Sequence, residues 1–362
     1  MTVRLYKSTD ASAPVLNGNA GSLVTVLDAI LVNGYGTQTA AGWTINQTAA
    51  NKRGYKQNTT GSNNTAGMCL YVDDTGPGGA GTKEARACGF ETMTAITPTG
   101  TGQFPSGAQS GVGIGTLVIR KSNTADATAR AWTCIANGQT IYLFIESGDF
   151  TSPLAAPVFV FGDFKPYKTG DQYAVGIIGR QDENQGNGAA NYENFQLTPL
   201  SNRGQSYTLQ NAMRGHYVAR HWTGVGGSKA CGKTFDYGRV VGNNTYQGSW
   251  ASDTGIADNY NNCYITYGRY ATTGAPTAPN GPDNSLLLSS MFINHSGSLR
   301  GYWPGLWVPL QDKPINHNDT FSIASGGLSG KSMIAQAFPA MINGNNSSEN
   351  GLIIVETSDT WS

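Results

Sequence analysis

Short apolar runs separated by turn-forming residues make up most of the chain. Many of these runs are rich in Val, Ile, Tyr and Phe, and segments with Gly, Asn, Asp and Pro bound them. Runs of this kind are typical of β-strands. The predicted strands are residues 67–72, 85–93, 115–120, 131–135, 140–146, 158–161 and 173–179, followed by 216–221, 239–241, 263–267, 286–293, 333–338 and 352–356.

Residues 21–33 depart from this pattern. Their apolar positions recur at spacings of three and four residues, which predicts an amphipathic helix that packs on a sheet. Ser22 stands where it could cap the helix, and Gly34 stands where a left-handed C-terminal cap belongs. A second local signal is Asn137-Gly138, which predicts a tight hairpin between strands 131–135 and 140–146.

A polar stretch that begins at residue 180 divides the chain. Residues 180–188 contain no large apolar side chain, which favours a connection over an element. We therefore expect a mainly β protein with two β-sandwich-like domains of short antiparallel strands. The first spans residues 1–185 and carries the helix, residues 186–205 form the linker, and the second domain spans residues 206–362.

Composition adds a tendency to associate. Only 13% of the residues are charged, and 23 Lys and Arg balance 23 Asp and Glu. A chain without net charge has no field that attracts nucleic acid, and weak mutual repulsion favours self-association. No apolar run is long enough for a membrane span, and there is no apolar signal core at the N-terminus. The five scattered cysteines are expected to be buried free thiols, with a disulfide as the alternative.

Three motifs resemble ligand sites but each departs from its pattern. Residues 325–332 end in Gly-Lys-Ser like a phosphate-binding loop, yet Ser325 replaces the first glycine, which favours a glycine-rich hairpin. Asp73 and Asp74 could begin a calcium loop, but Glu84 is out of register for the last ligand, so a turn is the better interpretation. His216 and His221 fall on opposite faces of a strand, so a zinc site from either histidine with Cys231 is only an alternative.

Catalytic chemistry has equally little support in the sequence. Paired carboxylates could cleave glycosides, but no spacing singles out two of the available acids, which are Glu84, Glu91, Glu146, Asp149 and Asp163. We therefore assign no catalytic, cofactor-binding or metal-binding residue and expect a protein that is not an enzyme. The aromatic runs 142–144 and 302–307 are interpreted as core or subunit interface, with a glycan site as the alternative.

Several segments together resemble a group of tailed-bacteriophage virion structural proteins. They are residues 12–36, 39–43, 83–86, 89–93, 126–132, 142–179, 300–309 and 356–361. The resemblance implies a homo-oligomeric structural component of the tail, neck or collar, or baseplate region, made in the bacterial host cytoplasm, with other virion proteins as partners. It carries no functional residues. The alternatives are a capsid decoration or cement protein and a module that binds host glycans.

Overall fold

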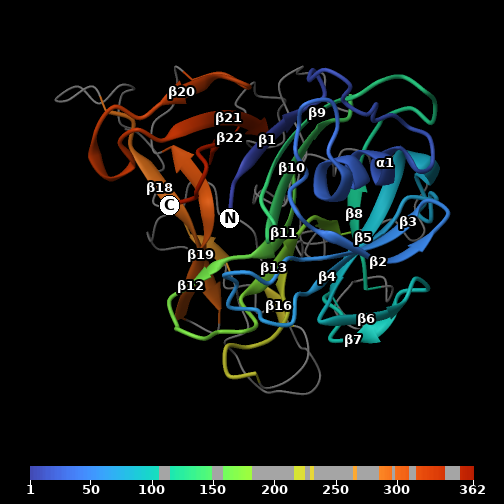
Figure 1. The fold of residues 1–362 in the computed structure, drawn as a ribbon, viewed down its shortest axis with the longest axis horizontal. Helices are drawn as coiled ribbons and strands as arrows, with labels where there is room; N and C mark the ends of the chain where they lie inside the picture. The colour runs from blue at the N-terminus through green and yellow to red at the C-terminus, as the bar shows by residue number, and fades with distance from the viewer. Residues whose placement is uncertain are drawn as a thin grey trace, which may run out of the picture.

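The computed structural model describes residues 1–105, 115–148, 158–181, 216–224, 229–231, 264–266, 285–295, 298–309, 315–338 and 351–362. The fold is mainly β, and every strand pairing is antiparallel. In the described part of the chain, the strands form three large sheets and one small hairpin (Figure 1). Among the described residues, none of the helices is long and apolar enough to cross a membrane.

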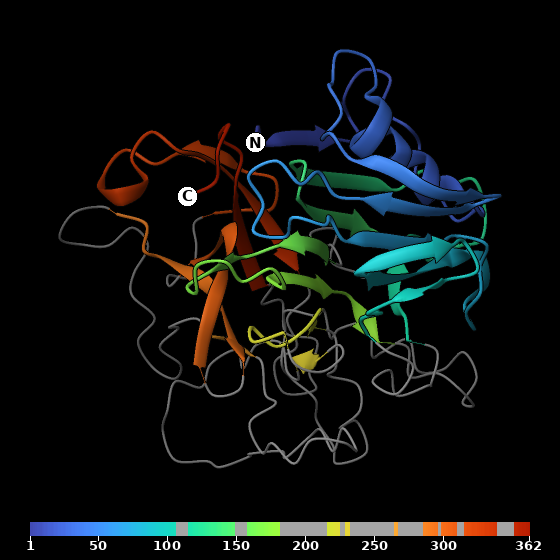
Figure 2. The ribbon, with the colours of Figure 1, turned by 60° about the horizontal axis from the view of Figure 1, so that its bottom comes forward.

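A central sheet lies between the other two large sheets. Its order is β1 (Arg4–Lys7), β9 (Ala131–Ala136), β10 (Thr140–Glu146), β11 (Val158–Asp163), β13 (Val175–Ile178), β15 (His216–Val218) and β16 (Lys229–Cys231). Figure 2 shows this layer between the strands of residues 44–120 and the C-terminal strands. A sheet covered on both faces needs apolar side chains at consecutive positions, and β10 and β11 supply them.

The first neighbouring layer carries the helix. This helix-side sheet has the order β14 (Arg180–Gln181), β8 (Leu117–Arg120), β5 (Glu84–Phe90), β4 (Cys69–Asp73), β3 (Lys52–Lys56) and β2 (Thr44–Ala49). One apolar cluster joins it to the central sheet and to the helix, with members such as Leu27, Leu70 and Leu143. A small hairpin, β6 (Thr92–Ala95) with β7 (Thr99–Thr101), follows β5.

The helix confirms the sequence prediction over the same residues. It runs as α1 (Ser22–Asp28) and continues as a π-helical turn over Ala29–Asn33. Leu23, Val24, Val26, Leu27, Ile30 and Leu31 are buried. Gly34 follows with a φ of 77°, a backbone conformation that glycine adopts without strain.

The other neighbouring layer is the C-terminal sheet. Its order is β17 (Tyr264–Thr266), β18 (Leu288–His295), β19 (Ser298–Pro309), β22 (Gly351–Glu356), β21 (Ser332–Phe338) and β20 (Thr320–Ser322), and β12 (Lys165–Pro166) pairs with β19. A second apolar cluster joins it to the opposite face of the central sheet, with Tyr142, Val160 and Trp303 among its members. The molecule is therefore a layered, sandwich-like arrangement of sheets.

The expected linker, residues 186–205, lies outside the described residues, as does the predicted strand 239–241. The strands on either side of the linker belong to one sheet, because β13 pairs with β15 and Ile177 faces Tyr217 in the register. β12 likewise pairs with β19 of the C-terminal sheet. The two halves of the chain thus share the central sheet, and the amide of Val3 even donates to the carbonyl oxygen of Asp359 at 2.8 Å.

The other predicted strands that fall on described residues lie where the sequence placed them, but the first or last residue of most of them differs from the predicted bounds. The hairpin at Asn137 is confirmed, since β9 pairs with β10 and the Asn137 amide donates to the Thr140 carbonyl oxygen at 3.0 Å. Sequence patterns missed β1, β2, β3 and β19, and also the short strands β7, β12, β14, β16 and β20. β2 and β3 carry few apolar side chains, and β19 contains Pro304 and two glycines that interrupt its pattern.

Candidate functional site

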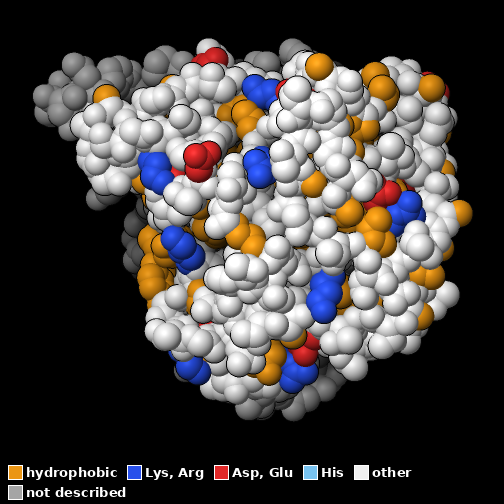
Figure 3. Space-filling view, in the orientation of Figure 1, with side chains coloured by type: hydrophobic (Ala, Val, Ile, Leu, Met, Phe, Trp, Pro, Cys, Tyr) orange, Lys and Arg blue, Asp and Glu red, His pale blue; other side chains and the backbone are white. Residues whose placement is uncertain are grey.

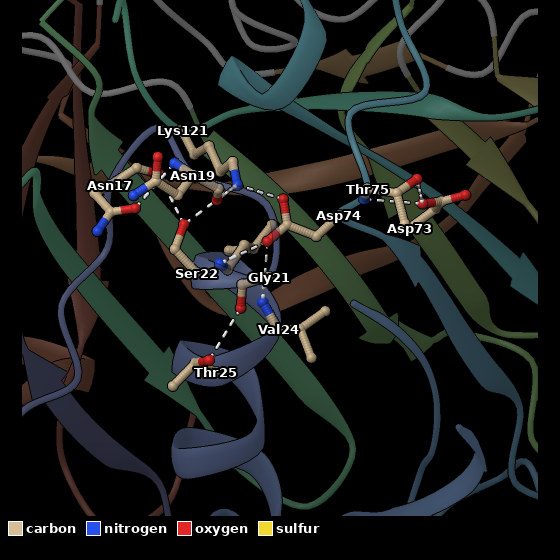
Figure 4. A network of polar contacts seen from close by, with 11 residues as sticks. Asn17, Asn19, Gly21, Ser22, Val24, Thr25, Asp73, Asp74, Thr75 and Lys121 are labelled. Carbon is tan, nitrogen blue, oxygen red and sulfur yellow. Dashed lines mark hydrogen bonds and ion pairs between the residues drawn. The ribbon is translucent and has the colours of Figure 1, made fainter. Parts of the chain in front are cut away.

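Among the described residues, a fully buried polar site lies at the start of α1, where β4 and β8 of the helix-side sheet end. Both Asp74 and Lys121 have side chains with no solvent exposure, and they form an ion pair. Figure 4 shows the Asp74 carboxylate between the Lys121 ammonium and the first turn of the helix. Lys121 also donates to Ser22 Oγ at 3.2 Å and to the Asn19 carbonyl oxygen.

The same carboxylate caps the helix. Asp74 Oδ2 accepts hydrogen bonds from the amides of Leu23 at 2.8 Å and Val24 at 3.4 Å. The prediction that Ser22 caps α1 is therefore wrong. Ser22 Oγ donates to the Asn17 carbonyl oxygen at 2.7 Å instead. A negative charge next to free amides and the positive end of a helix dipole is a stabilising arrangement.

Burial opposes both charges of this ion pair. Burial raises the pKa of Asp74, and it lowers the pKa of Lys121, so desolvation opposes both charges. Their mutual attraction and the helix amides oppose that cost. Asp74 contacts Lys121 and the amides at the start of α1, and Lys121 contacts Asn19, so the site holds three segments together (Figure 4).

A second enclosed polar group centres on Asp163, a partly buried carboxyl at the end of β11. It accepts hydrogen bonds from Gln57 Nε2 at 2.8 Å and from Ser62 Oγ. Burial raises the pKa of Asp163 to about 6, and the two hydrogen bonds oppose that rise. Gln57 Nε2 also donates to the Gln139 carbonyl oxygen at 2.6 Å. This group fastens the segment after β3 to the ends of β10 and β11.

The remaining carboxylates that were weighed as catalytic acids also have structural partners where the structure describes them. Glu84 pairs with Arg120 at 3.4 Å. Glu91 pairs with Arg220. Glu146 pairs with His317 at 2.9 Å. Asp149 lies outside the described residues.

Glu146 and His317 place a carboxylate beside an imidazole ring, as in a catalytic dyad. His317 Nε2 faces Glu146, while its Nδ1 accepts a hydrogen bond from the Ala337 amide at 3.0 Å. A catalytic base needs one ring nitrogen directed at a reacting group. Both nitrogens of His317 are occupied by the chain, and the contact connects β10 to β21.

The loop that resembles a phosphate-binding loop joins two antiparallel strands. β20 pairs with β21, and residues 323–331 form the connection between them, so the loop lies in this connection up to Lys331. Lys331 pairs with Glu356 at 2.6 Å and donates to the Thr360 carbonyl oxygen at 2.7 Å. The interpretation as a glycine-rich hairpin is confirmed, because a phosphate-binding loop leads from a strand into a helix.

The metal-site alternatives receive no geometric support from the described residues. In that part of the chain, no three His, Cys, Asp or Glu side chains are placed to hold a metal ion. Asp73 accepts hydrogen bonds from the Thr75 amide and hydroxyl at 3.0 and 2.6 Å, which confirms the turn. His216 and Cys231 are register partners in β15 and β16, and their side chains lie outside the description.

Cysteines and aromatics follow the sequence interpretation in part. Cys69, Cys88 and Cys134 are buried free thiols. Tyr142 and Trp303 lie in the core between the central and C-terminal sheets, with ring centroids 6.3 Å apart. Tyr302, next to Trp303, is only partly buried, so the aromatic run 302–307 divides between the core and the surface.

Two comparisons with known proteins place no constraint on function. No protein-family model matches the chain, and no curated protein is significantly similar to it.

Proposed function

We propose that the chain is a structural component of a tailed-phage virion that assembles as a homo-oligomer in the tail, neck or collar, or baseplate region. The resemblance of segments throughout the chain to virion structural proteins supports this role. The chain then acts in the virion after synthesis in the bacterial host cytoplasm, with other virion proteins and its own copies as partners.

The single structural observation that carries the proposal is that buried charged side chains form ion pairs between distant segments of the chain. Asp74 with Lys121 and Asp171 with Arg300 are enclosed ion pairs that tie together distant segments. A virion subunit requires a rigid scaffold more than a reactive site. Breaking a buried pair costs several kcal/mol, so such pairs hold segments in one arrangement.

The surface agrees with an assembled state. On the face in Figure 3, charged side chains are few and scattered among neutral polar atoms and small hydrophobic spots. With no net charge, copies repel one another weakly. A chain used repeatedly in one particle generates closed symmetric rings or trimers.

Quantitative mass spectrometry of purified particles from the encoding phage tests this function. We expect peptides of the chain at a stoichiometry of about tens of copies per particle, as in a symmetric tail, collar or baseplate assembly. About hundreds of copies would favour the alternative of a capsid decoration or cement protein. Absence of the chain from particles would contradict both.

A further inference from the structure

The outer face of the C-terminal sheet carries aromatic side chains that the chain covers only in part. Core residues Met291 and Ile293 flank Phe292 in β18, and core residue Trp303 adjoins Tyr302 in β19. Because successive side chains of a strand point to opposite faces, Phe292 and Tyr302 point away from the core.

Strand pairing extends this row on both sides of Tyr302. Phe292 faces Tyr302 in the register of β18 and β19, and Lys165 faces Tyr302 in the register of β12 and β19. Tyr167 follows two residues after Lys165, with ring centroids of Tyr167 and Tyr302 6.0 Å apart and tilted by 48°. We call Phe292, Tyr302, Tyr167 and Lys165 the aromatic platform.

The platform exists because β12 approaches β19 closely. A Cβ atom at Gly301 would lie 2.2 Å from the Lys165 carbonyl oxygen, so a side chain there would push β12 away. The Tyr167 amide donates to the Arg300 carbonyl oxygen at 2.8 Å and fixes the register. These contacts hold the platform on paired strands, which pre-organises it for binding.

Exposure and charge indicate what the platform would bind. Tyr167 is 55% exposed, which leaves much of its aromatic ring available for contact with a ligand. Lys165 is exposed, and its Nζ lies 6.0 Å from the centre of the Tyr302 ring. The segments that carry the platform, residues 164–170 and 298–302, contain Lys165, Lys168 and Arg300 but no Asp or Glu. Arg300 already forms an ion pair with Asp171. Hydrophobic and basic atoms adjoin over β12 and β19 in Figure 3.

We propose that the aromatic platform binds an acidic polysaccharide. The Tyr167 and Tyr302 rings stack on the C–H faces of successive sugar residues, whose weakly positive hydrogens suit the negative ring face. Lys165 pairs with a sugar carboxylate beside the rings. This binding activity goes beyond the structural role in the particle and does not depend on it.

Calorimetric titration of the full chain with oligogalacturonate tests the proposal, with maltooligosaccharides as the neutral probe. We expect oligogalacturonate to bind at least about tenfold more tightly than the neutral probe. Binding should weaken as salt rises, because the contact of Lys165 with a carboxylate is exposed and screened. Failure of oligogalacturonate to bind would overturn the proposal.

Three variants locate the site. Tyr167→Ala should weaken oligogalacturonate binding about tenfold or more, as expected for a stacking aromatic anchor. Lys165→Gln should weaken it by a smaller factor and flatten its salt dependence. Val15→Ala removes an apolar side chain that is 57% exposed elsewhere, and it should leave binding unchanged.

The same variants separate glycan binding from contact between copies of the chain. Sedimentation velocity should give the same oligomeric state for Tyr167→Ala as for the wild type. A smaller oligomer combined with unchanged oligogalacturonate binding would overturn the proposal and identify the platform as a subunit interface. Unchanged binding in both platform variants would likewise overturn it, whatever the oligomeric state.

Discussion

At the residue scale, distant polar side chains complete local structure. The start of α1 lacks a capping side chain of its own, and Asp74, 51 residues beyond Leu23, accepts the amide hydrogen bond. Local sequence patterns favoured Ser22 for this role because capping rules consider adjacent residues. The carboxylate came from a turn that the sequence correctly predicted, but only the packing of that turn on the helix reveals its second role.

Replacement of Lys121 tests how much the enclosed pair contributes. Lys121→Met should lower the free energy of unfolding by about 3–5 kcal/mol, because the Asp74 charge stays buried without its counterion. Lys52→Met is the matched control, since Lys52 pairs with Asp73 near the surface with its side chain 31% exposed. The control should lose less than about 1 kcal/mol. Urea unfolding measures both, and equal losses would contradict a structural role for the buried pair.

Asp163 predicts a pH dependence of stability. Its pKa rises from the usual 3.8 of an aspartate to about 6 in the folded protein. The folded state therefore binds the proton more tightly, and this stabilising contribution is full below the unfolded pKa and lost as pH rises through the folded pKa. The loss amounts to roughly 2–3 kcal/mol at most, at about 1.4 kcal/mol per pKa unit.

Asp163→Asn isolates this contribution. Urea unfolding at several pH values should show that the variant gains stability relative to the wild type between about pH 4 and pH 7. Asn keeps an oxygen that accepts from Gln57 or Ser62, so the fold is retained. A stability difference that stays constant across this window would show that burial does not hold the carboxyl near pH 6.

At the scale of elements, continuous apolar runs proved the most informative sequence feature. β10 and β11 were predicted from their runs of consecutive apolar residues, which these strands have because both faces of the central sheet are covered. β19 was missed because Gly301, Pro304 and Gly305 interrupt its pattern, and register shifts accompany its pairing with β18. The strand persists since neighbours on both sides supply its hydrogen bonds.

The aromatic platform was missed for a related reason. β12 is a strand of two residues, Lys165 and Pro166, too short for any periodicity. The neighbouring run of Lys and Tyr without acids was the signal that could have found it. Which of the aromatics in residues 302–307 face outward depends on the register of β19, and no local pattern fixes that register.

Arg300 connects elements on both sides of the expected linker. Its Nε and Nη2 donate to Asp171 at 2.9 and 3.1 Å, and further donors reach the carbonyl oxygens of Tyr173 and Arg220. A lysine ammonium lacks the planar guanidinium group that donates these hydrogen bonds in several fixed directions. Arg300→Lys should therefore lower the free energy of unfolding by about 2–3 kcal/mol.

Hydrogen exchange locates the effect of Arg300→Lys. Amides of β12, β15 and β19 should exchange faster than in the wild type, while those of β3 and β4 should exchange as before. Arg53→Lys is the matched control, because Arg53 pairs with Asp28 where both side chains are partly exposed. Uniform acceleration across all sheets, or equal effects of both variants, would contradict a local tie between these elements.

At the scale of the whole molecule, the sequence divides into two halves by composition, yet both halves contribute strands to the central sheet. The polar stretch from residue 180 has the composition of a connection. Strand pairing, however, joins β13 to β15 across it, because partners in a sheet are set by packing and not by sequence distance. The mainly β fold followed from the sequence, whereas the order of strands within each sheet depends on such long-range contacts.

We propose that this chain is a structural component of a phage particle. A cryo-EM map of the intact virion from the encoding phage tests it most directly. We predict density for the central, helix-side and C-terminal sheets in several symmetry-related copies that form a closed ring or trimer in the tail, neck or collar, or baseplate region. A virion map in which all ordered density is accounted for by other proteins, with no copy of these three sheets, would contradict the claim.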